Sequence, residues 1–488
     1  MRQVLVVYSP ACQAQLNLAL RLNTICKDQP YQVKLLECAQ PHQWATDPNQ
    51  DLVTNLGAGD VILDLCHARQ PSCDRGNHHP LYLVLGSYWR GWLQLLSSTS
   101  GFRQVAERSP ATELALVTSA DGQTWKTLMH AAIPSQRNWR FNQQQLIHAS
   151  ADYAALWLWH YHNQGRCLQL GKPVPCHGVA TVYTSDWARL WQKFRYTYER
   201  IRLRIQHWLK GQHTWQIGWE VSGQHHQKTR HQIRNQADLW FADPFPWEDE
   251  QKRRWIFCEQ LDEAGDRIGR IGLFELTNSQ LPHHHGVILA EKFHLSFPRL
   301  VATNGHIYAT VESGENKDVR LYETQYFPYQ WTLKRILLAG EAFIDPMLLR
   351  HDDGRWYLFV STCSISALRR EVAPELRLFH ANDLLNDKFE EHPLSPLLIS
   401  SRGGRNAGLL RQNGLVRVAQ LTGFGGIYGE SVALFRIDEL SPTSYRETPI
   451  DGAACGLDPN QLRRVLKTSH LHTLNEADGW FVYDFTAS

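Results

Sequence analysis

The sequence has few of the features that mark membrane, metal or nucleotide sites. No apolar run approaches the roughly 18 residues that a transmembrane helix needs. The ten cysteines form no CxxC pair, and the closest pairs, Cys66 with Cys73 and Cys167 with Cys176, lack metal-site spacing. GxGxxG and P-loop patterns are also missing, so no nucleotide site is indicated. Free thiols are therefore expected, as in a cytosolic protein.

A strong charge of one sign is missing too. The 50 Lys and Arg residues nearly balance the 48 Asp and Glu residues, for a net charge of +2. This balance argues against nucleic acid as a partner. Residues 1–9 carry one positive charge and a short apolar run, which predicts a first β-strand rather than a signal peptide. We expect a cytoplasmic protein, with peripheral attachment to a membrane left open.

One pattern occurs five times in the second half of the chain. Each copy is an apolar strand start, a polar turn and an aromatic-rich strand. The copies begin roughly 47 to 64 residues apart, a spacing that indicates the blades of a propeller. Their starts are Ala242-Asp243-Pro244-Phe245, Phe297-Pro298-Arg299-Leu300, Ile344-Asp345-Pro346-Met347, Asn406-Ala407-Gly408-Leu409 and His470-Leu471-His472-Thr473. The sequence thus predicts a five-bladed all-β propeller over residues 213–488, with residues 215–221 supplying an outer strand that closes the ring.

The first half of the chain has a different pattern. Residues 1–150 alternate strand and helix signals, with strands expected at 4–8, 31–36, 60–65 and 81–85 in a parallel sheet. A hairpin is expected across 113–131. The sequence therefore predicts a multidomain protein that begins with an α/β domain of Rossmann-like type.

A helical linker is expected at 151–212, and its second helix, 186–210, is basic and aromatic. Apolar residues recur there at steps of four and three, which is a heptad seam: Trp187, Trp191, Phe194, Tyr198, Ile201, Ile205 and Trp208. Lys and Arg dominate the other faces. Three interpretations stay open: the seam packs on a neighbouring domain, it lies on an anionic membrane surface, or it contacts a partner protein.

The propeller repeat predicts which distant residues meet. Blade starts place Asp243 and Asp345 at one mouth of the channel, and the second strands end at the same mouth with Glu259 and Glu312. Charged groups at a crowded axis are costly unless they are paired or used. These four carboxylates are the candidate catalytic residues, and the candidate ligand contacts are Arg405, Asn406, His472 and Trp247.

The two Asp-Pro starts, with Asp352-Asp353-Gly354-Arg355-Trp356-Tyr357 after the second, resemble the five-bladed glycosidases of family 43. The resemblance implies that Asp243 is a general base and that Asp345 orients an acid and tunes its pKa. The general base and the general acid of an inverting site stand about 6.5–9.5 Å apart. The resemblance also implies a channel ion such as calcium near a fifth-blade histidine, for which His470 is the candidate, although the sequence requires no cofactor. The family's acid Glu has no counterpart, because the fourth blade reads Arg405-Asn406-Ala407-Gly408.

Residues 238–488 also resemble the propeller at the N-terminus of plant glucosamine inositolphosphorylceramide transferases. The stretches that carry this resemblance are Phe241–Phe245, Leu295–Pro298, Tyr322 with Phe327–Trp331, Ile344-Asp345 with Arg355-Trp356-Tyr357, and His470–Asn475. It implies a glycan or glycolipid partner. The chain departs at Thr310-Val311-Glu312, where the family tends to have Pro before Glu.

The N-terminal element order resembles the formyltransferase fold. That family places an Asn-x-His pair after a central strand, where this chain reads Leu85-Gly86-Ser87-Tyr88, and only Asp121-Gly122 has a counterpart. The resemblance implies an inactive relative.

Three hypotheses follow. The favoured one is a carbohydrate-active propeller that binds or processes a glycan or glycolipid head group. The alternative is a non-catalytic scaffold of a glycosyltransferase or cell-envelope glycan synthesis complex. A formyltransferase-type enzyme is disfavoured.

Overall fold

The computed structural model divides the chain into two compact units, each described here by itself. The first comprises residues 1–205, 364–373 and 424–426, and the second residues 206–363, 374–423 and 427–488. The structure describes all residues except 1, 28, 30, 38–55, 57–59, 67–80, 98, 120–123, 165–168, 181–184, 211–213, 223–227, 236–237, 277–281, 366–370, 412–413, 456, 469 and 487–488.

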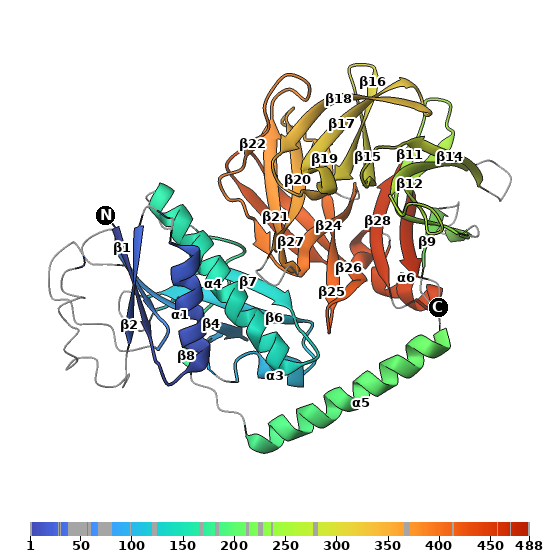
Figure 1. The fold of residues 1–488 in the computed structure, drawn as a ribbon. Coiled ribbons are helices and arrows are strands. Elements are labelled where there is room, and N and C mark those ends of the chain that lie inside the picture. The colour runs from blue at the N-terminus through green and yellow to red at the C-terminus, as the bar shows by residue number, and fades with distance from the viewer. Residues whose placement is uncertain are drawn as a thin grey trace. The chain divides into compact units, whose positions relative to one another are not determined.

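The first unit is built on a mixed sheet (Figure 1). Its strands are β1 (Arg2–Tyr8), β2 (Tyr31–Glu37), β3 (Val61–Asp64), β4 (Leu81–Trp89), β5 (Trp92–Leu95), β6 (Ala111–Thr118), β7 (Lys126–Pro134) and β8 (Gly178–Ala180). The order is β2-β1-β3-β4-β5-β8, and β2, β1, β3 and β4 run parallel as the apolar runs predict. β6 and β7 form the expected hairpin, which adds antiparallel to β4.

The helices that begin in this unit are α1 (Gln13–Ile25), α3 (Phe102–Ala106), α4 (Trp139–Gln164) and α5 (Asp186–Lys210), and residues 206–210 of α5 belong to the second unit. α1 packs on α4, and an Arg21–Asp152 ion pair of 2.7 Å joins the two. Leu85 to Tyr88 lie inside β4, where no Asn or His stands, and Asp121-Gly122 lie outside the described residues. The mixed sheet is therefore observed, whereas the formyltransferase likeness remains a prediction.

The second unit contains five antiparallel sheets, which are the five predicted blades (Figure 1). Blade 1 is β11 (Leu239–Glu248), β12 (Arg254–Asp262), β13 (Arg270–Leu276) and β14 (His283–Leu289); blade 2 is β15 (Ser296–Thr303), β16 (His306–Ser313), β17 (Asp318–Tyr326) and β18 (Gln330–Ala339). Blade 3 is β19 (Ile344–Arg350), β20 (Trp356–Ile365), β21 (Glu371–Ala381), β22 (Glu390–Glu391) and β23 (Leu398–Ile399); blade 4 is β24 (Arg402–Leu410), β25 (Val416–Gly423), β26 (Ile427–Leu440) and β27 (Tyr445–Ile450).

Blade 5 joins the two ends of the propeller sequence. Its order is β10-β9-β29-β28, so β28 (Leu471–Ala477) and β29 (Trp480–Thr486) pair with β9 (Trp215–Ser222), and β10 (Lys228–Ile233) is outermost. Short helical turns at Gly314–Asn316 and Gly452–Cys455 and helix α6 (Pro459–Leu466) complete the unit. The predicted closing strand is thus confirmed. It holds the ring shut because the last blade cannot form without residues from the start of the propeller.

The second strand of each blade is buried on both faces, which explains its apolar composition. In β20, Trp356, Leu358 and Val360 pack into the core shared with blade 2, while Tyr357 and Phe359 pack into the core shared with blade 4. Alternate side chains of a strand point to opposite faces, so one strand serves two cores. Side chains of β12 and β29 divide between two cores in the same way.

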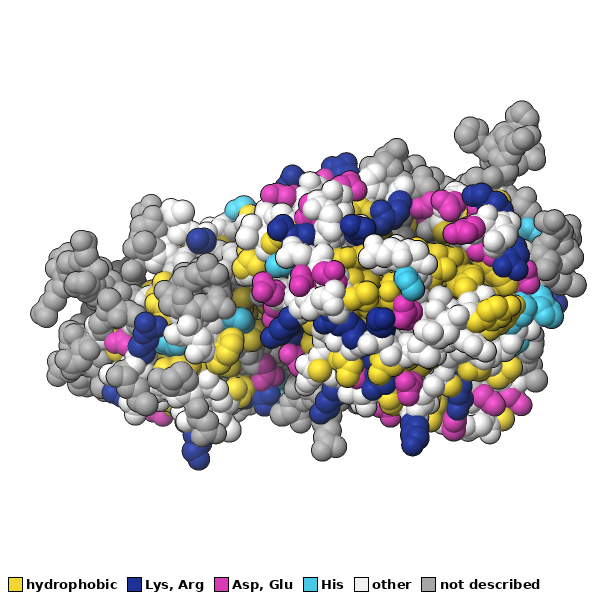
Figure 2. Space-filling view, turned by 90° about the horizontal axis from the view of Figure 1, so that it is seen from above, with side chains coloured by type: hydrophobic (Ala, Val, Ile, Leu, Met, Phe, Trp, Pro, Cys, Tyr) yellow, Lys and Arg dark blue, Asp and Glu magenta, His cyan; other side chains and the backbone are white. Residues whose placement is uncertain are grey.

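Lys, Arg, Asp and Glu side chains are interspersed over the face of the molecule drawn in Figure 2.

Within the described part of the chain, no helix has the length and apolarity that crossing a membrane requires. Cysteines 12, 26, 66, 176, 258 and 455 are free thiols.

Candidate functional site

The first strands of blades 1, 2 and 3 share the same backbone irregularity, a β-bulge. Each contains a bulge where pairing with the second strand is interrupted, between Ala242 and Phe245 in blade 1, with equivalent breaks in the other two. At these bulges Asp243, Phe297 and Asp345 have φ of 49°, 47° and 49°. Non-glycine residues rarely adopt positive φ, so the surrounding structure must hold the two aspartates in this conformation. Proline follows each of the three residues.

Acceptors on second strands hold these bulges from the neighbouring blade. Asp345 N–H donates to Glu312 Oε2 at 2.8 Å, and Asn406 N–H donates to Ser361 Oγ at 3.2 Å. Asp243 N–H donates to Asp484 Oδ2 at 2.9 Å, which links blade 5 to blade 1. These hydrogen bonds join the strand start of one blade to the second strand of the preceding blade, a pairing that the repeat did not predict. They give Glu312 and Asp484 a structural role in addition to any chemical role.

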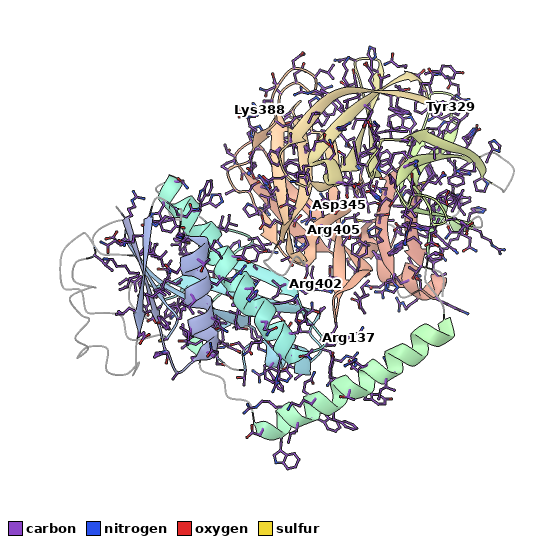
Figure 3. All side chains as sticks on the ribbon, in the orientation of Figure 1. Arg137, Tyr329, Asp345, Lys388, Arg402 and Arg405 are labelled. Carbon is purple, nitrogen blue, oxygen red and sulfur yellow. The ribbon has the colours of Figure 1, made fainter. Side chains whose placement is uncertain are left out.

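Asp345 forms an ion pair with Arg405. Arg405 donates from Nε and Nη2 to the two carboxylate oxygens of Asp345, at 2.7 and 2.9 Å (Figure 3). Asp345 is 2% exposed, so the pair is screened little by solvent. Burial alone would lower the pKa of Arg405, but Asp345 raises it well above its ordinary value. With both oxygens engaged by Arg405, Asp345 is held as a charge partner.

Asp243 lies in a different environment, a buried triad with His472 and Asp484. His472 Nδ1 is 3.0 Å from Asp484 Oδ2 and 3.3 Å from Asp243 Oδ1. Burial alone would lower the pKa of His472, but Asp484 and then Asp243 raise it to about 9, so the imidazole is a cation at neutral pH. Burial raises the pKa of Asp243, His472 opposes that rise, and Asp484, Glu259 and Asp345 add to it.

The two predicted glutamates have separate partners. Burial and then Asp345 raise the pKa of Glu312 to about 7, so this carboxyl is close to half protonated at neutral pH. Glu259 is 6% exposed and contacts His294, with Oε1 and Nε2 3.1 Å apart. The hydrogen bond to Glu259 raises the pKa of His294. Glu312 is therefore the group at this mouth that could donate a proton near neutrality.

Three other predicted residues occupy different places. Asn406 is fully buried and donates from Nδ2 to the Asp345 carbonyl at 3.0 Å. Trp247 packs against the hydrophobic core formed by blades 1 and 2, with its ring centroid 6.4 Å from that of Phe327. His470 contacts Thr486 Oγ1 at 3.1 Å. The structure thus gives Asn406 a structural contact with Asp345 and packs Trp247 into a core.

Two aromatic residues that the sequence did not single out stand beside the charged groups. Tyr428 Oη lies 2.5 Å from His472 Nε2, and Arg405 lies over the Tyr428 ring at 5.0 Å. Tyr428 as a residue is 42% exposed. The ring of Trp215 lies 4.8 Å from that of His472. Tyr428 therefore connects the Asp345 pair to the His472 triad and leaves part of its surface open to solvent.

The close approach of Trp215 requires a glycine. Gly429 has φ of 60°, and a Cβ there would lie 2.8 Å from the Trp215 ring. Among the residues that sequence reasoning missed, Asp484 had a findable signal, since it ends the second strand of the fifth copy as Glu312 ends that of the second. Tyr428, Trp215 and His294 lie outside the repeated strand starts and ends, so the repeat carries no signal for them.

Asp243, His472 and Asp484 also form a grouping of metal-ligand type, with ligand atoms within 4.8 Å of one another. The donor set does not fit calcium, which prefers oxygen ligands throughout. Binding of a metal through His472 would also have to displace the proton that Asp484 and Asp243 hold on this imidazole. Without a metal, the raised pKa of His472 makes it the cation of this cluster. The grouping contains His472, whereas the sequence pointed to His470.

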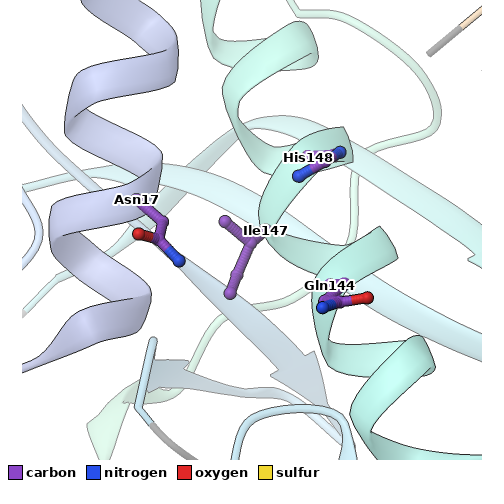
Figure 4. A pocket seen from close by; sticks show the side chains of 4 residues that line it. All are labelled: Asn17, Gln144, Ile147 and His148. Carbon is purple, nitrogen blue, oxygen red and sulfur yellow. The ribbon is translucent and has the colours of Figure 1, made fainter. Parts of the chain in front are cut away.

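A small cavity of the first unit is a separate feature. Its volume is about 180 Å³, and it is lined by Asn17, Gln144, Ile147 and His148 from α1 and α4 (Figure 4). Burial lowers the pKa of His148, so its imidazole is neutral at pH 7. None of its lining residues belongs to the propeller cluster.

Five antiparallel blades with acidic and basic side chains at their strand starts define a five-bladed β-propeller protein. A family model described as "Glucosamine inositolphosphorylceramide transferase 1, N-terminal" matches residues 219–475, more than half of the chain. The chain therefore belongs to this family.

Plant relatives named glucosamine inositolphosphorylceramide transferase 1 are similar to part of the chain. The protein of Oryza sativa subsp. japonica is 32% identical over 170 residues, which cover 34% of this chain and 22% of the rice protein. The Arabidopsis thaliana protein is 29% identical over 169 residues, covering 34% of this chain and 21% of that protein. The matched part thus spans about a fifth of the length of these relatives.

Two solved structures of glycoside hydrolases are also similar. Zg3597, a family 117 enzyme of Zobellia galactanivorans, is 17% identical, with a TM-score of 0.35 over 48% of this chain and 75% of that chain. A thermostable family-43 enzyme is 14% identical, with a TM-score of 0.37 over 51% and 88%. At these scores the comparison carries no argument about function, and the propeller assignment stands on the strand order.

Proposed function

We propose that the strand-start mouth of the propeller binds the sugar or polyol part of a glycan or glycolipid head group. The observation that carries the proposal is the cluster of Asp243, Asp345, Arg405, Tyr428 and His472, drawn from four blades of a family whose plant relatives are named as transferases of glucosamine to a glycolipid.

The cluster offers the contacts that a sugar needs. The exposed part of Tyr428 can contact the apolar side of a pyranose ring, and Arg405 beside it, with a side chain 14% exposed, can bond hydroxyls. His472, rather than a metal ion, supplies positive charge between Asp243 and Asp484 in this proposal. Convergent polar groups beside an aromatic surface are typical of ligand sites.

Processing of the bound sugar would depend on Glu312. Asn406 stands where a family-43 glycosidase has its acid, and an amide cannot protonate a leaving group. Glu312, with its pKa raised to about 7, is the candidate acid, and Asp243 the candidate base. Catalysis would require proton transfer by both Glu312 and Asp243. Binding of the sugar would require no proton transfer.

A specific observation supports the alternative of a non-catalytic subunit of a glycan synthesis complex. Arg405 occupies both carboxylate oxygens of Asp345, so this residue is held by the protein rather than presented to a substrate. We further propose that the N-terminal α/β unit is a formyltransferase-like relative that contributes no catalysis, because β4 has neither the Asn nor the His of that family.

Glycan-array binding and glycosidase assays on the wild type, Asp243→Asn and Tyr428→Ala test the proposal. We expect wild-type binding and a loss of about twofold to tenfold for Tyr428→Ala, since stacking on an aromatic ring contributes about 0.5–1.5 kcal/mol beyond buried area. Tyr326→Ala removes a 63% exposed tyrosine of blade 2 and serves as the control. Binding without turnover in any variant favours the non-catalytic form, and an absence of binding on the array contradicts the proposal.

A further inference from the structure

Helix α5 exposes an apolar seam, contrary to the expectation for a linker helix that packs its aromatic stripe on a domain. Five seam residues are more than half exposed, namely Trp187 at 82%, Trp191 at 63%, Phe194 at 65%, Tyr198 at 59% and Ile201 at 56%. The side chains of Ile205 and Trp208 lie outside the described residues. Large exposed apolar side chains in one contiguous row mark an interaction surface rather than ordinary surface variation.

The opposite, polar side of α5 is the side that the first unit holds. Gln192 and Glu199 are buried, and Glu199 pairs with Arg108 at 2.9 Å. Arg195 donates to the Ala106 carbonyl at 3.1 Å. The helix is thus fixed through its polar side rather than through its apolar seam. The seam is exposed because of the way in which α5 is attached.

Three cations stand on the exposed part of α5. At 3.6 residues per turn, Arg202 lies directly beside the seam, whereas Lys193 and Arg200 lie about a quarter turn beyond its other edge. All three are exposed, and within the described residues none has a carboxylate at ion-pair distance. The two acids of the helix are engaged, Asp186 with Arg189 and Glu199 with Arg108. The surface of α5 therefore joins exposed aromatic rings to unneutralised positive charge.

We propose that the seam of α5 lies on an anionic lipid surface. A helix in the interface buries one apolar face at the headgroup boundary while its basic side chains meet anionic headgroups. Tryptophan and tyrosine are the residues that prefer this boundary. An acidic protein or a second copy of this chain would accept the cations, but an outward row of aromatic rings with cations on the exposed faces beyond it is the pattern of helices that lie at lipid surfaces. The proposal is independent of the sugar site.

Flotation of the full chain with vesicles tests the proposal. One set of vesicles is phosphatidylcholine alone, and the other is an equal mixture of phosphatidylcholine and phosphatidylserine. We expect binding to the mixture only, weakened by added salt. The triple variant Lys193→Gln/Arg200→Gln/Arg202→Gln should bind about a hundredfold more weakly, because each cation near an anionic surface contributes about fivefold. Trp187→Ala/Trp191→Ala/Phe194→Ala should abolish binding.

A charge-matched control comes from three exposed lysines elsewhere, changed together as Lys27→Gln/Lys172→Gln/Lys292→Gln. This variant should bind like the wild type, as should Tyr428→Ala, which separates failure of this proposal from failure of the sugar site. Three flotation results would overturn the membrane proposal. They are failure of the wild type to bind the mixed vesicles, equal binding to both sets of vesicles, and a loss of binding in the lysine control as large as that in the triple variant of α5. A dimer in analytical ultracentrifugation that the seam variant dissociates would also overturn it, since the seam would then be covered by a second copy.

Discussion

Asp243 and Asp345 occupy equivalent positions in blades 1 and 3 and have the same backbone conformation, with φ of 49°. Their partners differ. Arg405, which stays charged at any physiological pH, holds Asp345, whereas the titratable His472 and a second carboxylate, Asp484, hold Asp243. The same bulge thus produces one permanently charged pair and one cluster whose charge depends on pH. The repeat determines where a side chain points, and its neighbours determine its chemistry.

The largest effect should come from breaking the Asp345 pair. Arg405→Leu leaves a buried carboxylate without its cation and should lower the free energy of unfolding by about 3–5 kcal/mol. Chemical denaturation measures this change. Lys388→Leu, at an exposed lysine, is the control and should change stability little. The double variant Arg405→Leu/Asp345→Asn should recover part of the loss, and a double variant no more stable than the single one would show that the lost charge balance is not the cause.

The blade 1 cluster should instead produce a pH dependence. The pKa of His472 rises from 6.5 to about 9 on folding. A raised folded pKa contributes stability that is fully present below the unfolded value and lost as pH rises through the folded value. His472 should thus contribute about 3 kcal/mol at pH 6, lost by about pH 9, since one pKa unit corresponds to about 1.4 kcal/mol. Denaturation curves across this range, compared with those of His472→Gln, measure the difference, and parallel curves for the two proteins would refute the pairing.

A smaller loss is expected for Asp484→Asn. Asp484 accepts hydrogen bonds from Asp243 N–H and from Thr473 N–H, the latter at 2.6 Å, and an amide keeps an oxygen for only one of them. The cost should be about 2 kcal/mol at pH 6. The same change removes the Asp484 charge, which raises the pKa of His472 more than the Asp243 charge does. The pH dependence of stability that His472 causes should therefore become smaller. If Asp484→Asn keeps the same pH dependence of stability as the wild type, Asp243 rather than Asp484 would be the cause of the raised His472 pKa.

An effect of similar size but opposite sign concerns Glu312, which accepts a hydrogen bond from the Asp345 N–H. Its pKa rises from 4.5 to about 7 on folding, so stability is lost as pH rises through that interval and the group ionises. Glu312→Gln still accepts the Asp345 N–H and should be neutral at pH 5 and stabilising by about 2 kcal/mol at pH 8, since one pKa unit corresponds to about 1.4 kcal/mol. Thermal unfolding at the two pH values measures this, and destabilisation at pH 8 would show that the ionised carboxylate is needed.

Periodicity made the fold predictable. Five copies of one pattern gave the number of blades, and the early strand at Trp215–Ser222 gave the closure, because both depend on burial patterns that are local in sequence. The same repeat placed Asp345 and Glu312 at one mouth, but it did not predict the hydrogen bond between them. The partners Tyr428 and His294 could not be found in this way, since they reach the mouth from parts of the blades that vary. The sequence left open whether the seam of α5 faces outward, because the heptad pattern shows that an apolar face exists but not which face of the helix the rest of the first unit holds.

The central claim is that His472 is the cation of the blade 1 cluster while Arg405 is that of blade 3. Nuclear magnetic resonance titration of histidine-labelled protein, with His472 assigned by the signal missing from His472→Gln, tests it most directly. The account predicts a midpoint near pH 9 for His472, unchanged by added calcium. A midpoint at or below 6.5, or a calcium-dependent loss of the imidazolium signal at neutral pH, would contradict it and would make the triad a metal site instead.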